Sequence, residues 1–242
     1  MFYFLLFPDL TYNVFLIAAA IVPAVFLMVR VYRADRLERE SPVQLGRMVI
    51  AGVLSALIAT LSERILSWLL DLAVEENTLL YNLILYFFIV AVSEEGAKFY
   101  MLYSRSWNSP EFNSQFDGVV YAVFVSLGFA LWENISYVMH FGFSTALVRA
   151  VTAIPGHACF GVFMGLFYGF AKKYQNYGRP VFSRLFRVLG FLIPVLLHGA
   201  YDFIASSQTN AGNWYFIGFI AVLFAASFVL VGKMSKRDQY IA

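Results

Sequence analysis

The chain has 242 residues, of which 61% are hydrophobic, 19% aromatic and only 13% charged, and its mean hydropathy is +0.71. A soluble globular protein averages roughly 45–50% apolar and about 25% charged residues, so a single soluble core is excluded. The formal net charge of +2 says little by itself, because the distribution of the charges along the chain matters more. The composition therefore predicts an all-α protein, a helical bundle in a lipid bilayer that forms a single domain over residues 1–242.

Seven hydrophobic segments follow one another along the chain. A helix needs about 20 apolar residues to cross the ~30 Å hydrocarbon layer. The predicted spans are 10–29, 48–70, 79–102, 116–139, 147–171, 188–206 and 214–232. The fifth is long, and its start, residues 144–152, is expected to be a short interfacial helix. Residues 30–47 are predicted to form a charged, solvated loop.

The basic residues are distributed unevenly between the connections of these spans. Fifteen of the 17 Lys and Arg residues fall on one side, in alternate connections and the C-terminal tail, when Lys98 near the end of the third span is counted with the connection that follows it; Arg149 is the main exception. The positive-inside rule then places the N-terminus outside and the C-terminus in the cytoplasm. A multi-pass protein of the bacterial cytoplasmic membrane is predicted, with the lipid bilayer as its surroundings and no nucleic-acid partner.

Two adjacent acids lie near the end of an apolar run in the third span. Glu94 and Lys98 are four residues apart and share a helix face, whereas Glu95 is rotated by about 100° and is expected to point into the bundle alone. Neighbouring carboxylates in a low dielectric suit general acid–base chemistry. A buried ion pair that fixes helix packing explains them equally well.

The fourth span carries a polar stripe. Phe129, Glu133 and Tyr137 recur every four residues, and Asn134 adjoins Glu133. An acid in a lipid-spanning helix suggests a functional site. The alternative is that these side chains form interhelical hydrogen bonds, each worth roughly 0.6–2 kcal/mol. Taken by itself, this stripe slightly favours that structural role over a catalytic one.

The two remaining spans that carry ionisable side chains, the fifth and the sixth, each contain a histidine. His157 follows Pro155-Gly156, where proline is expected to kink the helix so that irregular backbone can line a cavity. Small residues at a four-residue spacing follow it and are expected to let another helix approach closely: Gly161, Gly165 and Gly169.

The sixth span supplies an imidazole and a carboxylate four residues apart. Asp202 is expected to hold one ring nitrogen of His198, whereas His140 lies beside a loop and is expected to be solvated. Six side chains from four helices then provide a base for water and donors for an oxyanion: Glu94, Glu95, Glu133, His157, His198 and Asp202.

Four motifs in order resemble those of the PrsW family of bacterial intramembrane proteases, related to the type II CAAX prenyl endopeptidases. They are Glu94-Glu95-x-x-Lys98, FDGVVYAVFVSLGFALWENISY (116–137), HACFGVFMGLFYG (157–169) and LLHGAYDF (196–203). The resemblance implies site-1 cleavage of a membrane-anchored anti-sigma factor in a stress response. It also implies a catalytic core of Glu94, Glu95 and His157, completed by Glu133, His198 and Asp202. Lys98, Asn134 and Tyr137 are expected to support that site.

Two mechanisms remain open. In the glutamic one, a glutamate takes a proton from water and no cofactor is needed. In the other, His157, His198 and Glu95 hold a zinc ion with one open position. The chain lacks an H-E-x-x-H pair, and the related prenyl endopeptidases are usually described as glutamate enzymes, so the metal-free mechanism is favoured.

Two non-enzymatic hypotheses also remain. Intramembrane Glu and His residues build proton relays, so a proton-coupled transporter or channel is the main alternative. No inverted repeat is visible between the two halves of the chain, which counts against it. A pure scaffold is the third hypothesis.

Overall fold

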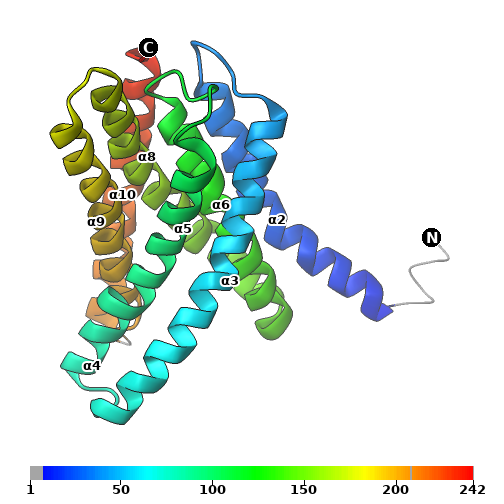
Figure 1. The fold of residues 1–242 in the computed structure, drawn as a ribbon. Coiled ribbons are helices and arrows are strands. Elements are labelled where there is room, and N and C mark those ends of the chain that lie inside the picture. Colours follow the sequence, from blue (N-terminus) through cyan, green and yellow to red (C-terminus); the bar gives the residue numbers. More distant parts are fainter. Residues whose placement is uncertain (1–7, 208, 242) are drawn as a thin grey trace.

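Seven helical segments are long and apolar enough to cross a membrane, as predicted, in the computed structural model, which describes residues 8–207 and 209–241. Five are single helices: α2 (Pro8–Ala34), α3 (Pro42–Ala73), α6 (Asp117–Phe141), α9 (Pro180–Ala205) and α10 (Asn210–Lys236). The third segment joins α4, η1 and α5, and the fifth joins α7 and α8 (Figure 1). No β-strand occurs in the described residues, which confirms the all-α class.

The loop predicted at residues 30–47 is much shorter in the structure. Helix α2 continues to Ala34 and α3 begins at Pro42, so only residues 35–41 are non-helical. The side chain of Ser41 accepts a hydrogen bond from the Gln44 amide, and Pro42 supplies the fixed backbone angle that favours a first helical position. The prediction failed because long basic side chains continue a helix beyond the apolar run while their charges reach the interface.

The third span contains a π-helical segment that the sequence pattern did not predict. Helix α4 (Leu79–Leu83) leads into η1 (Ile84–Val90), and α5 (Ala91–Ser106) then carries Glu94 and Glu95. A run that is apolar on all sides gives no periodicity to distinguish a π turn from an α turn. Such turns occur frequently at functional sites, and this one ends four residues before Glu94.

The break in the fifth span lies upstream of the proline. Helix α7 (Phe143–Val151) is the predicted short helix, and α8 (Ala153–Asn176) starts after Thr152, whose backbone is non-helical at φ −120° and ψ −74°. Pro155 therefore lies in the first turn of α8, where its missing N–H removes no intrahelical bond. The expected proline kink is wrong, because the chain had already turned at Thr152.

Helix α6 lies at the centre of the bundle, between α2, α3 and α8. The predicted close approach of the α8 glycines is confirmed, and its partner is α6. A Cβ atom built on Gly165 would lie 2.4 Å from the Gly118 carbonyl oxygen, and one on Gly169 would lie 2.2 Å from that of Gln115. On the other side of α6, a Cβ on Gly52 of α3 would lie 2.1 Å from the Val125 carbonyl oxygen. These contacts bring the backbones of three helices together and set the spacing of the side chains that they carry.

Candidate active site

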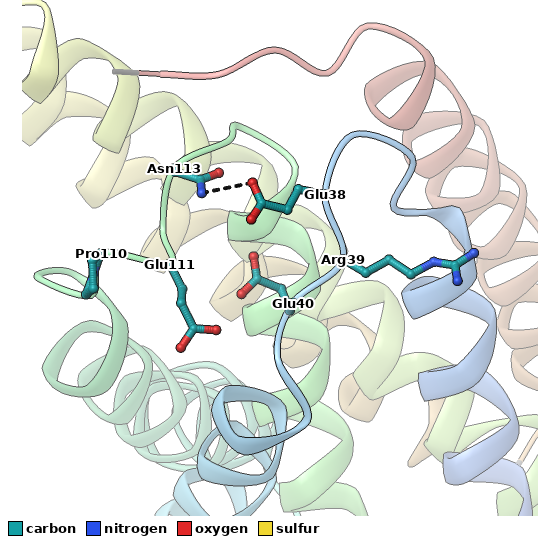
Figure 2. Close-up of a pocket in the computed structure, with 6 residues that line it drawn as sticks. All are labelled: Glu38, Arg39, Glu40, Pro110, Glu111 and Asn113. Atoms are coloured by element: carbon teal, nitrogen blue, oxygen red, sulfur yellow. Dashed lines mark hydrogen bonds between the residues drawn. The ribbon is translucent and has the colours of Figure 1, made fainter.

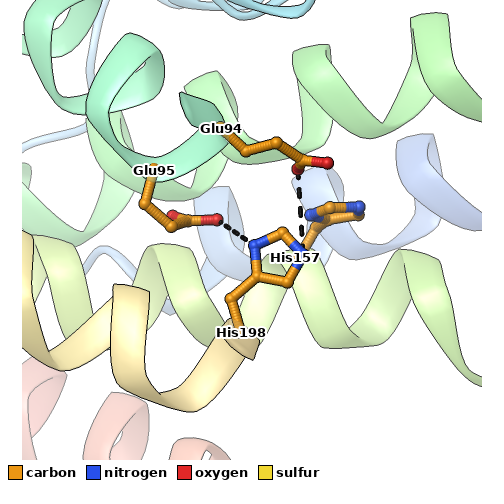
Figure 3. A group of neighbouring side chains, drawn as sticks. All are labelled: Glu94, Glu95, His157 and His198. Atoms are coloured by element: carbon orange, nitrogen blue, oxygen red, sulfur yellow. Dashed lines mark hydrogen bonds and ion pairs between the residues drawn. The ribbon is translucent and has the colours of Figure 1, made fainter. Parts of the chain in front are cut away.

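Glutamates of α5 and histidines of α8 and α9 converge on one buried place in the bundle. Figure 3 shows Glu94, Glu95, His157 and His198 with their polar ends directed toward one another. One ligand atom of each of these four side chains lies within 4.8 Å of the others. The structure thus brings together residues that are up to 104 positions apart in the chain.

Lys98 lies at the middle of this group and is completely buried. Its Nζ donates to Glu95 Oε1 at 2.8 Å and to Glu94 Oε2 at 3.0 Å, and it lies 3.2 Å from His157 Nδ1. The prediction that Glu95 points into the bundle alone is therefore wrong. Positions three and four residues away are both neighbours on a helix surface, so one lysine contacts both acids.

The contacts of His157 define its tautomer. An ammonium group can only donate, so Nδ1 accepts from Lys98, and Nε2 carries the proton that it donates to Glu133 Oε2 at 2.8 Å. The ring of Phe129, one turn before Glu133 on α6, lies 3.8 Å from Lys98 Nζ. The α6 stripe thus places an aromatic face against Lys98 and a carboxylate against His157.

His198 lies between carboxylates. Its Nδ1 is 2.9 Å from Glu95 Oε1, and its Nε2 is 3.3 Å from Asp202 Oδ2 and 3.8 Å from Glu94 Oε2. Asp202 thus contacts one ring nitrogen, as the four-residue spacing predicted. Since both nitrogens face acceptors, an imidazolium fits this position. Phe160 of α8 stacks against the ring with 4.8 Å between centroids.

Exposure increases across the cluster in one direction. The side chains of Glu95 and Lys98 are 0% exposed and that of Glu94 is 8% exposed, whereas Glu133 and Asp202 reach 22% and 23%. Glu133 and Asp202 are therefore the members of the cluster most open to the surroundings of the protein. Glu94 is the more accessible of the paired acids.

Arg149 of α7 belongs to this exposed side, although sequence reasoning treated it only as a charge on the wrong face of the membrane. Its guanidinium pairs with Glu133 at 2.9 Å, donates to Asn134 Oδ1 at 2.9 Å and lies 4.0 Å from the centre of the Tyr137 ring. Asn134 also donates to the Ala20 carbonyl of α2 at 3.0 Å. Asn134 and Tyr137 thus hold Arg149, and neither side chain forms a described hydrogen bond with the histidines.

Glu63 of α3 is the acid that sequence reasoning missed. One of its carboxylate oxygens is buried without a hydrogen-bond partner among residues 8–207 and 209–241. An acid within the second predicted span was the available signal. His140, in contrast, is exposed and bonds only to the Ser136 carbonyl within the described structure, as expected for a solvated residue.

The donor set fits a zinc ion by type and spacing. Two imidazoles and two carboxylates offer ligand atoms within 4.8 Å of one another, and Glu95 Oε2 is buried with no hydrogen-bond partner in the described residues. Lys98 contacts three of these four side chains, however, and so holds the same donors that a metal would need. An ammonium group and a zinc ion are therefore competitors for this cluster.

The fold and site define a multi-pass membrane protein with acids and imidazoles gathered between its helices. Residues 40–231 match the family described as PrsW family intramembrane metalloprotease. The chain belongs to the PrsW family of intramembrane proteases.

Curated relatives support this membership over almost the full chain, and each carries the name Protease PrsW. That of Shouchella clausii is 30% identical over 225 residues, covering 93% of this chain and 98% of the relative. That of Oceanobacillus iheyensis is 35% identical, and the match covers 78% of this chain and 82% of the relative. That of Bacillus subtilis is 31% identical, and the match covers 86% of this chain and 90% of the relative. No solved structure matches the chain. Bacterial relatives and seven spans indicate a multi-pass bacterial membrane protein, and the family favours peptide hydrolysis over proton-coupled transport.

Proposed function

We propose that the protein hydrolyses a peptide bond of a membrane-anchored protein with Glu94 as the general base. The observation that carries this proposal is the meeting of Glu94, His157 and His198 at the edge of the buried cluster, in a chain of a protease family. Glu94 is preferred to Glu95 because its side chain is 8% exposed, whereas that of Glu95 is 0% exposed and shares one oxygen with Lys98 and His198.

The proton path follows from the contacts. Glu94 takes a proton from a water molecule, and the resulting hydroxide attacks the substrate carbonyl carbon. The negative charge then forms on the carbonyl oxygen, near the Nε2–H of His198, which Asp202 and Glu95 orient. Collapse of the tetrahedral intermediate breaks the C–N bond, and the proton passes from Glu94 to the leaving amine. The products are a carboxylic acid and an amine.

His157 positions the water in this scheme. Its contact with Lys98, at 3.2 Å, is the longest of the three made by that ammonium group, so a water molecule can replace it as the donor to Nδ1. Glu133 holds the opposite nitrogen and Arg149 holds Glu133. The outermost charges thus orient the histidine that lies nearest the reacting water.

Zinc-dependent hydrolysis is the second candidate, favoured by the unpartnered Glu95 oxygen and by the family description. His157, His198, Glu94 and Glu95 are the side chains that would hold the ion. When bound, zinc would polarise the substrate carbonyl and lower the pKa of a coordinated water. Lys98 would first have to release the donors.

We further propose, from the family resemblance, that the substrate is a membrane-anchored anti-sigma factor and that this cut is the first of two. The exposed side of the site supports an extended segment entering near Glu133 and Asp202, at the end of the bundle that carries α7. By the positive-inside prediction, that end faces the outside.

The experiment uses the full chain in detergent or vesicles with a tagged single-span anti-sigma factor, and locates the cut by mass spectrometry. Glu94→Gln is expected to lower the rate by about 10²–10⁴-fold, the usual contribution of a general base. His140→Ala, which removes an exposed imidazole, should cleave like the unmodified chain. Equal cleavage by Glu94→Gln would exclude Glu94 as the base.

A parallel incubation separates the two mechanisms. Cleavage that survives prolonged treatment with a strong zinc chelator would support the metal-free mechanism. Cleavage that is lost on chelation and restored by zinc alone would support the metal-dependent one. If a set of membrane-anchored substrates is cleaved but the anti-sigma factor is not, the substrate proposal fails and the protease assignment stands.

A further inference from the structure

A second group of buried carboxylates lies at the far end of α6 from the site described above. Asp117 begins that helix and Glu133 follows 16 residues later, which is about 24 Å along the helix axis. One carboxylate oxygen from each of Asp35, Glu40 and Asp117 lies within 4.8 Å of the other two, and all three side chains are buried. The group therefore joins the connection between α2 and α3 to the start of α6.

Asp35 is the unusual member, because it is only 2% exposed and both of its carboxylate oxygens lack a hydrogen-bond partner within the described part of the chain. The backbone N–H groups of Leu37 and Glu38 lie near it and favour its charged form. Burying a carboxylate without a partner costs several kcal/mol. This side chain therefore calls for a ligand that the protein itself does not supply.

The other two carboxylates are held in place by hydrogen bonds. The Tyr121 hydroxyl donates to Glu40. Asp117 accepts from the Ser114 amide at 2.6 Å, the Ser114 hydroxyl at 2.7 Å and the Asn113 amide at 3.0 Å. A carboxylate has about four lone-pair positions, so both side chains keep acceptor capacity after these bonds are made.

No basic side chain neutralises this group. Within residues 8–207 and 209–241, no Lys or Arg forms an ion pair with Asp35, Glu40 or Asp117, and the Arg39 guanidinium lies 5.5 Å from the centre of the Tyr32 ring. The negative charges thus lack a counter-charge from the protein.

A solvent-facing pocket adjoins one member of the group, Glu40. Figure 2 shows Glu40 directed into a pocket of about 220 Å³ that is lined by Glu38, Arg39, Glu40, Pro110, Glu111 and Asn113. Glu40 belongs both to the pocket and to the buried group. A hydrated ion can therefore approach Glu40 from the side of Glu38 and Glu111.

We propose that Asp35, Glu40 and Asp117 bind a divalent cation that prefers oxygen ligands, of the class of Mg²⁺ and Mn²⁺. The three donors are all carboxylate oxygens, with no imidazole or thiol among them, which is the ligand set of such hard cations rather than of zinc. The bound ion would join residues 35–41 to the start of α6. Asp238 near the C-terminus, which accepts from the Phe116 amide at 2.9 Å, adds a further negative charge beside the site. This proposal does not depend on the protease mechanism.

The test uses Mn²⁺ as the probe with the purified full chain after treatment with a chelator. Electron paramagnetic resonance follows the loss of the signal of free Mn²⁺. One bound ion is expected in the unmodified chain and in His198→Ala, which removes a donor of the other cluster. Binding should fall at least tenfold in Asp35→Asn and Glu40→Gln, and excess Mg²⁺ should displace the ion. Glu75→Gln is the matched control, because it removes a carboxylate that lies at the opposite end of the bundle. This variant should bind Mn²⁺ like the unmodified chain.

A stability measurement gives a second readout that does not require binding to be detected directly. In chelator, Asp35→Asn should unfold at a temperature equal to or above that of the unmodified chain, because an unpaired buried charge has been removed. Mg²⁺ should raise the unfolding temperature of the unmodified chain but not that of Asp35→Asn. The proposal is overturned if Mn²⁺ does not bind, if binding is lost in His198→Ala but kept in Asp35→Asn, or if Mg²⁺ stabilises both proteins equally.

Discussion

Lys98 joins the two glutamates of α5 to His157 of α8, and its own side chain is completely buried. Sequence spacing predicted its contact with Glu94, since residues four apart share a helix face. The contact with His157 lies beyond any spacing argument, because it depends on how α8 packs beside α5. The presence of charges in the membrane could therefore be predicted, whereas their partners could not.

Replacing Lys98 by Met should destabilise the fold. Two buried carboxylates would lose their positive neighbour, and removing one partner of a buried ion pair costs roughly 3–5 kcal/mol. Thermal unfolding in detergent measures this loss. Lys98→Arg keeps the charge and should recover part of the stability. A Lys98→Met protein as stable as the unmodified chain would mean that the glutamates are compensated elsewhere.

Replacing Arg149 by Gln should lower catalytic efficiency by about tenfold, equivalent to about 1.4 kcal/mol of transition-state free energy. Arg149 touches Glu133, which in turn orients His157, so it acts as a positioning residue. Steady-state cleavage kinetics measure the effect, and Arg149→Lys should restore most of the activity. If Arg149→Lys is no better than Arg149→Gln, the charge is not what matters at this position.

At the scale of the elements, the close contact of α6 with α8 places Glu133 beside His157. Four-residue glycine spacing in α8 predicted a close contact, but many helices could have supplied the partner. The structure identifies α6, and Gly118 on that helix faces Gly165 and Gly169. The partner could not be predicted because small residues permit an approach without specifying which backbone makes it.

Gly165→Ala should destabilise the bundle, because its new methyl group would lie 2.4 Å from the Gly118 carbonyl oxygen and the two helices would have to separate. Overpacking of this kind typically costs 1–3 kcal/mol. Gly218→Ala in α10 is the matched control. No atom lies within 4 Å of the added methyl there, so it should be neutral or stabilising by up to about 1 kcal/mol. Chemical unfolding of both variants in mixed micelles tests the difference, and equal stability would contradict the close packing.

The π-helical turn η1 is the element that sequence reasoning missed entirely. Phe87, within this turn, packs where a side chain on Gly199 would be, since a Cβ there would lie 2.5 Å from Phe87 Cδ1. Gly199 follows His198 on α9, so η1 packs against the turn of α9 that carries a histidine of the site. An evenly apolar run such as residues 84–90 contains no signal for this local unwinding.

At the scale of the whole molecule, orientation in the membrane remains a prediction from charge. The uneven distribution of Lys and Arg predicts a cytoplasmic C-terminus. The end of the bundle that carries α7 would then face outward, and the carboxylate group around Asp35 would face the cytoplasm, where Mg²⁺ is plentiful. The active-site proposal thus predicts that substrate enters from the outside, and the cation-site proposal predicts that the ion enters from the cytoplasm.

Single-cysteine labelling should test this orientation. In a Cys159→Ala background, Glu75→Cys is expected to react with a membrane-impermeant maleimide on intact cells, since residue 75 lies in a connection on the predicted outer side. Gln175→Cys, in the last turn of α8 at the other end of the bundle, should react only after the cells are opened. The reverse pattern would invert the topology and move the exposed side of the active site into the cytoplasm.

The sequence by itself determined that this protein has seven segments suited to cross a membrane. Whether a segment prefers lipid or water depends on its own apolar and charged residues, so each span can be identified from its local sequence. It also identified the acids and histidines that interrupt those helices. Only the tertiary structure decided that Lys98 links Glu94, Glu95 and His157, that Arg149 supports Glu133, and that Asp35, Glu40 and Asp117 meet at the other end of α6. These contacts depend on the packing of helices far apart in the chain, and no local pattern encodes which faces will meet.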